Sequence, residues 1–161
     1  MLTLSYASVS EFFPTASELG KCALYDNTYW CPKMPWIDEW WRLVKYDINW
    51  TPPKASRLAR LFGAKLFVYD KMNDCDNFSL RALVMAQKLF SYTPSGKTGG
   101  AMSPAVFEVA GHLLGSQHAM NAVIQDVDGS PCLWLVEPQD ANLLLRNPRN
   151  GERVAIQNVR G

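Results

Sequence analysis

The pattern of apolar and polar positions divides the chain into a part with helical spacing followed by a part with strand spacing. The run TASE at 15–18 fits a helix-capping box, so we expect a short helix after Thr15. WIDEWWRLVKY, which begins at Trp36, has apolar residues at helical intervals and predicts a second helix. TPPKASRLARLF has Thr51 as a candidate N-cap and Pro52 at the first helical position, which predicts a third helix.

A longer helix is predicted from about Cys75 to Phe90, and it is apolar on most of its sides. Asn77, Arg81 and Lys88 form a narrow polar stripe along it. This pattern is typical of a mostly buried helix, so we expect this helix to be central to the fold. The run SYTPSGKTGG follows and, because it is rich in turn-forming residues, predicts a loop.

Beyond this loop the spacing becomes that of short strands. AVFEVAGHLL, HAMNAVIQ and PCLWLVEPQ carry β-branched and aromatic residues, and DVDGS between the last two is a hairpin signal. RVAIQNV predicts one more strand near the end. Helices followed by antiparallel strands indicate an α+β fold with a helical N-terminal half. We expect one domain over residues 1–161, with a helical, aromatic-rich part at 1–72 and the Cys75 helix plus sheet at 73–161.

Composition and charge argue against two classes of partner. The chain has 161 residues and a net charge of +1, with Lys and Arg spread along it, which argues against a nucleic-acid surface built on charge. No apolar run approaches the roughly 18 residues of a membrane helix. The N-terminus lacks the basic start and continuous apolar core of a signal peptide. We therefore expect a cytoplasmic protein, or one in a particle assembled there, without nucleic-acid or membrane partners.

The cysteines give the first candidate for chemistry. All four are scattered without a C-x-x-C pair, which is typical of free thiols in a reducing compartment. Cys75 stands between Asp74 and Asp76 at the start of the predicted central helix. The positive potential of a helix N-terminus favours a thiolate there. The two neighbouring carboxylates oppose it by like-charge repulsion.

The predicted hairpin supplies a possible partner for Cys75. A turn at Val127–Asp128 puts His118 directly opposite Glu137, whereas a turn at Asp128–Gly129 makes them diagonal neighbours. Both registers keep the two side chains on one face, and a three-residue bulged loop would separate them. A histidine can accept a thiol proton, and a carboxylate can orient that histidine. We therefore predict Cys75 as nucleophile, His118 as base and Glu137 as orienting residue.

These motifs resemble a known superfamily. DCDNF, HAMN and VEPQ, within roughly Asn73–Gln139, are similar to the Cys, His and acidic boxes of the transglutaminase-like branch of the papain-like superfamily. The resemblance implies a central helix packed on a small antiparallel sheet. It implies a cysteine-dependent hydrolase or acyl-transferase, such as a thiol protease, acting on an amide or isopeptide bond of a peptide or protein, for example in a cell wall. The layout is also similar to uncharacterised phage-encoded proteins, which would place the protein in a host cytoplasm or a virion.

The resemblance has departures and implies further residues. Glu137 stands where Asp is commoner, and Asn73–Asp74 stand where this family often has Gly. The backbone N–H of Cys75, with Gln139 and Asn121, are candidate oxyanion donors, and Asp74 is a supporting residue. No cofactor or metal is expected.

Other interpretations remain open. Cys75 alone is compatible with a buried structural thiol. Cys75, His112 and His118 are a possible zinc set, although no compact ligand spacing supports one. The aromatic residues between Tyr29 and Trp50 fit either a core or a cleft wall. From another functional class, the chain could be a non-catalytic binding or assembly protein, such as a phage accessory or virion protein. The sequence does not predict the oligomeric state.

Overall fold

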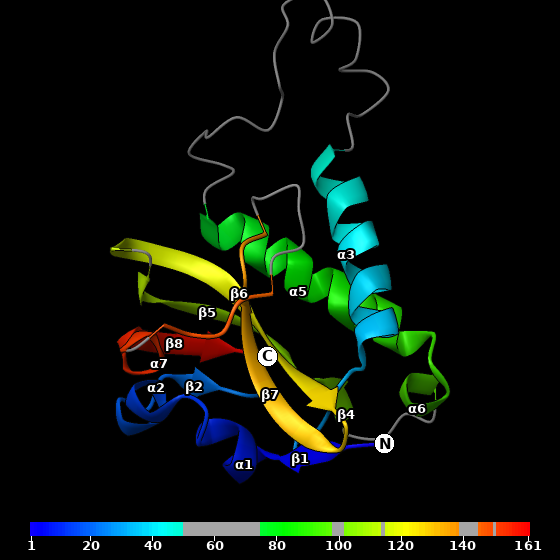
Figure 1. The fold of residues 1–161 in the computed structure, drawn as a ribbon, viewed down its shortest axis with the longest axis horizontal. Helices are drawn as coiled ribbons and strands as arrows, with labels where there is room; N and C mark the ends of the chain where they lie inside the picture. Colours follow the sequence, from blue (N-terminus) through cyan, green and yellow to red (C-terminus); the bar gives the residue numbers. More distant parts are fainter. Residues whose placement is uncertain (50–74, 98–101, 114, 139–144, 150) are drawn as a thin grey trace, which may run out of the picture.

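A computed structural model describes residues 1–49, 75–97, 102–113, 115–138, 145–149 and 151–161, and Figure 1 shows their arrangement. The larger sheet has five strands, in the order β2 (Cys22–Ala23), β8 (Ile156–Arg160), β5 (Val106–Leu113), β6 (Ser116–Val127) and β7 (Ser130–Val136). The smaller sheet has three, in the order β1 (Thr3–Ser5), β3 (Thr28–Trp30) and β4 (Met102–Pro104). Each sheet contains one parallel pair, β2–β8 and β3–β4, beside antiparallel pairs.

The helices cover both sides of the larger sheet. They are α1 (Tyr6–Ser10), α2 (Pro14–Glu18), α3 (Met34–Asn49), α5 (Cys75–Ser91), α6 (Pro94–Lys97) and α7 (Glu152–Ala155). Helix α5 contacts β5 and β6, and α3 packs on α5, whereas α2 contacts β8 and α7. Figure 1 shows α3 and α5 above the sheet and α1 and α2 below it.

Two apolar clusters fill these two sides, because side chains alternate between the faces of a strand. Val106, Val123 and Val136 face α3 and α5, where they meet buried side chains including those of Trp40 and Ala82. The opposite face carries the larger cluster, formed by the following residues: Val9, Phe13, Ala16, Tyr29, Cys31, Ala105, Phe107, Val109, Leu113, Met120, Ala122, Ile124, Leu133, Leu135, Ile156 and Val159. The chain therefore has a core on each side of the sheet.

The long helices and the hairpin agree with the sequence prediction. Helix α3 covers the run from Trp36, and α5 begins at Cys75, although Leu80 and Val84 on it are exposed. The short helix α2 begins at Pro14, not after Thr15, and it has no side-chain cap. The helix predicted from Thr51 lies outside the described residues. Within the predicted loop, α6 forms one short turn of helix.

The helical N-terminal half is wrong. Strands β1, β2 and β3 all lie within the first 30 residues. Each has only two or three residues, which is too short for an alternating pattern to be recognised. Two of them are specified by partners far along the chain, since β3 pairs with β4 and β2 with β8, whereas β1 pairs with β3. The parallel pairs likewise contradict the prediction of a small, purely antiparallel sheet.

The hairpin has the second of the two predicted registers. Val127 pairs with Ser130, so the turn consists of Asp128 and Gly129. Both have positive φ, 51° and 85°, as a type I′ turn requires. The Asp126 carboxylate accepts the Gly129 N–H at 2.8 Å and closes the turn.

An ion pair fastens the chain after β7 to the end of the sheet. The Arg146 guanidinium donates to both carboxylate oxygens of Glu152, at 2.5 and 3.0 Å, and the Arg149 N–H donates to the same carboxylate at 2.6 Å. Burial acts to raise the pKa of Glu152, but these hydrogen bonds outweigh it and lower the pKa. The pair joins α7 to the segment that bridges to Leu135 of β7.

Replacing Glu152 by Gln should lower the free energy of unfolding at pH 7 by about 1 to 3 kcal/mol, the usual cost of losing a charged hydrogen-bond pair. The folded pKa is lowered, so the stabilisation is complete above the unfolded pKa of about 4.3 and is lost as the pH falls through the folded pKa. Urea unfolding of the unaltered chain and of Glu152→Gln at pH 7 and near pH 3 measures the two free energies of unfolding. A difference between the two proteins that is equal at both pH values would contradict the prediction.

Gly111 should not tolerate a side chain. It lies where the β5–β8 register shifts, and an added Cβ would stand 1.9 Å from the backbone oxygen of Ala155. Gly111→Ala should therefore push β8 from β5 and cost about 1 to 3 kcal/mol, as overpacking does. Thermal unfolding measures the loss, and an unchanged Tm would show that the two strands separate without cost.

Candidate functional site

The N-terminal end of α5 meets β6 of the larger sheet. Strand β7 ends at Val136, which pairs with Asn121 of β6, and among the described residues no strand pairs with the β6 segment 116–120 on that side. The Ala119 N–H of this segment donates to the Cys75 sulfur at 3.4 Å. The first residue of α5 therefore supplies an acceptor for a backbone donor of β6.

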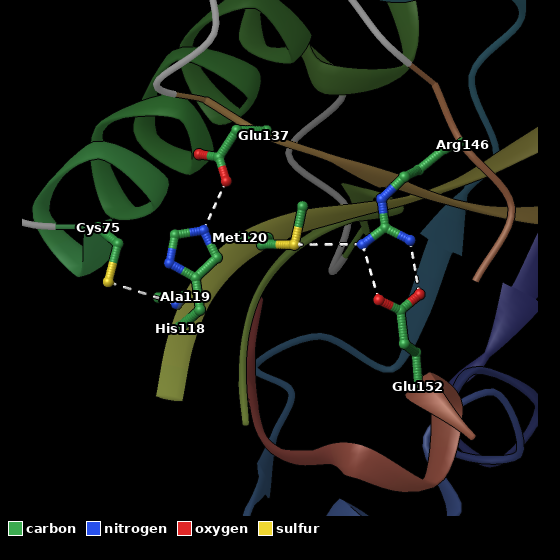
Figure 2. A network of polar contacts seen from close by, with 7 residues as sticks. All are labelled: Cys75, His118, Ala119, Met120, Glu137, Arg146 and Glu152. Carbon is green, nitrogen blue, oxygen red and sulfur yellow. Dashed lines mark hydrogen bonds and ion pairs between the residues drawn. The ribbon is translucent and has the colours of Figure 1, made fainter. Parts of the chain in front are cut away.

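His118 and Glu137 meet beside Cys75. His118 Nε2 and Glu137 Oε2 lie 2.5 Å apart, with only 13% and 22% of the two side chains exposed. Figure 2 shows the Glu137 carboxylate and the Cys75 sulfur on opposite sides of the imidazole ring. The diagonal register is sufficient to bring the pair together, as the hairpin argument predicted for either turn.

A cavity of about 330 Å³ opens beside these residues and continues across three strands. It is lined by Cys75, Asp76, Glu108, Ala110, Gln117, His118, Ala119, Asn158 and Arg160. Its floor follows from strand pairing, because Glu108 lies opposite Arg160, and Ala110 lies between Asn158 and Ala119. We call this cavity the polar pocket.

Glu108 is the buried acid of the polar pocket. Glu108 is 6% exposed, and its Oε2 atom has no hydrogen-bond partner among the described residues. Burial raises the pKa of Glu108; Arg160, 3.7 Å away, counteracts this, and Asp76 adds to it. The pocket thus combines an under-bonded carboxyl group with a guanidinium group on its rim.

The predicted supporting residues fall elsewhere. Asn121 is fully buried, and its amide donates to the backbone oxygens of Ser79 at 2.9 Å and Phe107 at 3.3 Å. These bonds hold α5 on the sheet and use both amide hydrogens, so Asn121 is a structural tie and not an oxyanion donor. Gln139 and Asp74 lie outside the described residues.

The other sequence candidates do not join the site. His112 is exposed and does not line the polar pocket. Within the part of the chain that the structure describes, no group of three or more His, Cys, Asp or Glu is placed to hold a metal ion. Burial raises the pKa of Cys22, and it raises the pKa of Cys31 to about 12. Tyr29 and Trp40 are fully buried, which favours the core interpretation of the aromatic cluster.

Besides two alanines, four pocket residues with polar or charged side chains escaped the sequence argument, namely Glu108, Gln117, Asn158 and Arg160. One signal was available, because Glu108 is a single acid within the apolar run AVFEVAGHLL. Asn158 and Arg160 depend on the pairing of β5 with β8, two strands separated by more than forty positions, whereas Gln117 lies on β6 beside His118. No helix among the described residues is long and apolar enough to cross a membrane.

Solved structures share this fold. No family model and no curated protein matches the chain. A structure described as the PSL1a–E64 complex superposes with a TM-score of 0.66 at 17% identity, over 99% of this chain and 51% of that one. A Polyporus squamosus lectin bound to the human-type influenza-binding epitope Neu5Acα2-6Galβ1-4GlcNAc gives a TM-score of 0.58 at 17% identity, over 90% and 45%. The chain spans about half the length of each of these two chains.

These structures correct the family prediction. The fold is that of part of a lectin chain, so the resemblance to transglutaminase-like or papain-like cysteine peptidases is wrong. The hydrolase or acyl-transferase function and the peptide or cell-wall substrate, which rested on that resemblance, lose their support. The physical reason is that three short boxes covered under half of the chain. A Cys-headed helix over a hairpin that carries His and Glu does not by itself define a fold.

Proposed function

We propose that this chain is a binding domain of the lectin type and that its polar pocket recognises a carbohydrate. The observation that carries the proposal is the pocket itself, a cavity of about 330 Å³ with polar groups from three strands and one helix. The lectin-like fold adds a reason to choose sugar over peptide. This is the binding alternative to an enzyme.

The groups in the pocket suit sugar hydroxyls. A hydroxyl both donates and accepts, and the pocket offers both kinds of partner. The Asp76 and Glu108 carboxylates accept, the Arg160 guanidinium donates, and the Gln117 and Asn158 amides do either. Hydrogen bonds to the charged groups are the stronger ones. A pair of neighbouring hydroxyls on one ring could therefore be held by several strands at once.

The two solved structures suggest which ligands to try. The Polyporus squamosus lectin was bound to Neu5Acα2-6Galβ1-4GlcNAc, and PSL1a formed a complex with E64. This chain spans about half of those chains, and we take both compounds as probes to be tested on it. The trisaccharide is the first probe of the polar pocket, and E64 is the second.

We also propose that Cys75 is a reactive thiol in this pocket, with His118 accepting its proton and Glu137 orienting His118. The Cys75 sulfur accepts the Ala119 N–H at 3.4 Å, and Cys75 is the first residue of α5. The short contact from Glu137 to His118 Nε2 leaves the other ring nitrogen to face Cys75. This second proposal concerns the reactivity of the thiol and does not include hydrolysis.

Isothermal titration of the chain with the trisaccharide, galactose and N-acetylglucosamine tests the first proposal. We expect Asn158→Ala to raise the Kd about 3- to 10-fold, the effect of losing one ligand hydrogen bond. Gln157→Ala is the matched control, since Gln157 is the next residue of β8 and does not line the polar pocket. Absence of binding by the unaltered chain to all three sugars would contradict the proposal.

Alkylation with iodoacetamide near pH 7, followed by peptide mass spectrometry, tests the second proposal. Cys75 should react first, and His118→Ala should slow its reaction about 100-fold, the low end of what a positioned base contributes. Cys22 and Cys31 should react slowly, because burial raises the pKa of both thiols and keeps them protonated. Intact-mass measurement after incubation with E64 asks whether that compound becomes attached to Cys75.

Cys132 is the internal control for access, because like Cys75 it is half-buried. If Cys75 reacts no faster than Cys132, or if His118→Ala leaves its rate unchanged, the thiol is a passive one. Far-UV circular dichroism of each variant shows whether its fold is intact.

A further inference from the structure

A second pocket lies farther along α5. It measures about 340 Å³ and is lined by Tyr25, Asp26, Leu83, Val84, Gln87, Ser103 and Gly161. Tyr25 is 76% exposed and Val84 54% exposed, so a ring and an aliphatic side chain stand largely uncovered at this place. We call it the Tyr25 pocket.

Polar groups surround the base of the Tyr25 pocket. The Ser103 hydroxyl, in a residue only 5% exposed, bonds to the Asp26 carboxylate and lies 3.3 Å from Gln87 Oε1. An aromatic ring beside a carboxylate and an amide suits a molecule with an apolar face and a polar rim, because each part finds its own kind of partner. A sugar ring is such a molecule.

The loop that carries Tyr25 is held firmly by the core. The buried Tyr29 hydroxyl accepts the Asp26 N–H at 3.1 Å and donates to the Gly161 backbone oxygen at 3.0 Å. The Tyr25 N–H donates to that same oxygen at 2.8 Å. The backbone at Tyr25 is therefore held in place before any ligand arrives, and fixing the backbone of a binding residue in advance lowers the entropic cost of binding.

The two pockets adjoin each other along two elements. On β8, Arg160 lines the polar pocket and the next residue, Gly161, lines the Tyr25 pocket. On α5, Asp76 lines the first pocket, Val84 and Gln87 line the second, and exposed Leu80 lies between them. Asp76, Leu80 and Val84 have the spacing of one helix face. At about 1.5 Å per residue, the distance along the helix from Asp76 to Gln87 is about 16 Å.

We propose that the two pockets are subsites for a single oligosaccharide, one sugar unit in the polar pocket and another on Tyr25. This rests on the proposed carbohydrate binding and adds that the ligand has more than one unit. Exposed Leu80 lies on α5 between the subsites, and exposed Val84 belongs to the second one, so an oligosaccharide that spans both would pass over Leu80. A single sugar fills one subsite, whereas a longer one gains contacts in both.

The test compares the trisaccharide Neu5Acα2-6Galβ1-4GlcNAc with galactose and N-acetylglucosamine by isothermal titration, using Asn158→Ala and Tyr25→Ala. Each change should raise the Kd of the trisaccharide. Tyr25→Ala should do so roughly 5- to 30-fold, the effect of losing a modest apolar contact. Each single sugar should depend on only one of the two residues. Tyr25→Phe keeps the ring and should keep the affinity.

Tyr92→Ala is the matched control, because Tyr92 is also an exposed tyrosine, at 65%, and lines neither pocket. Tyr25 is so exposed that its removal should leave Tm nearly unchanged, which a thermal scan checks. If the trisaccharide responds to Asn158→Ala but not to Tyr25→Ala, the extended site is wrong and the polar pocket stands. If the unaltered chain binds none of the sugars, carbohydrate binding itself fails, and the extended site with it.

Discussion

The attachment of α5 to the β5–β6 hairpin is the constraint on which the site depends. Asn121 sets the position of the helix over the sheet, because its buried amide donates to the backbone of α5 at Ser79 and to the backbone of β5 at Phe107. Apolar packing of Ala82 against Val106 and Val123 then fixes the distance between helix and sheet. With the helix fixed in this way, its first turn reaches Ala119 of β6, and its side chains line both pockets. Both pockets are consequences of that placement.

Local sequence patterns predicted the elements whose formation depends on residues close in sequence. The spacing in α3 and α5 and the Asp128–Gly129 turn are local features, and so is the meeting of His118 with Glu137. Pairings between distant segments were not accessible, because no short pattern records which strand lies beside which. The floor of the polar pocket is such a case, since Glu108 and Arg160 become neighbours only through the β5–β8 ladder.

The family prediction failed for a related reason. It used the order of Cys75, His118 and Glu137, which the structure does bring to one place, and extended it to the whole chain. The parts of the fold that separate one family from another are elsewhere, in the parallel pairs β2–β8 and β3–β4 and in the strands near the N-terminus. The prediction that these three residues lie close together and the prediction of the family are thus separate for this chain, and only the second is wrong.

The early end of β7 has a consequence for solubility. A sheet edge with unsatisfied N–H and C=O groups is a template on which another chain can add a strand. Among the described residues no strand pairs with the β6 segment 116–120 on the β7 side, and the Cys75 sulfur accepts its Ala119 N–H. The Cys75 thiol therefore takes up one backbone donor that another chain would need in order to add a strand to β6 at this place. The thiol proposed to be reactive would then also cover part of a strand edge.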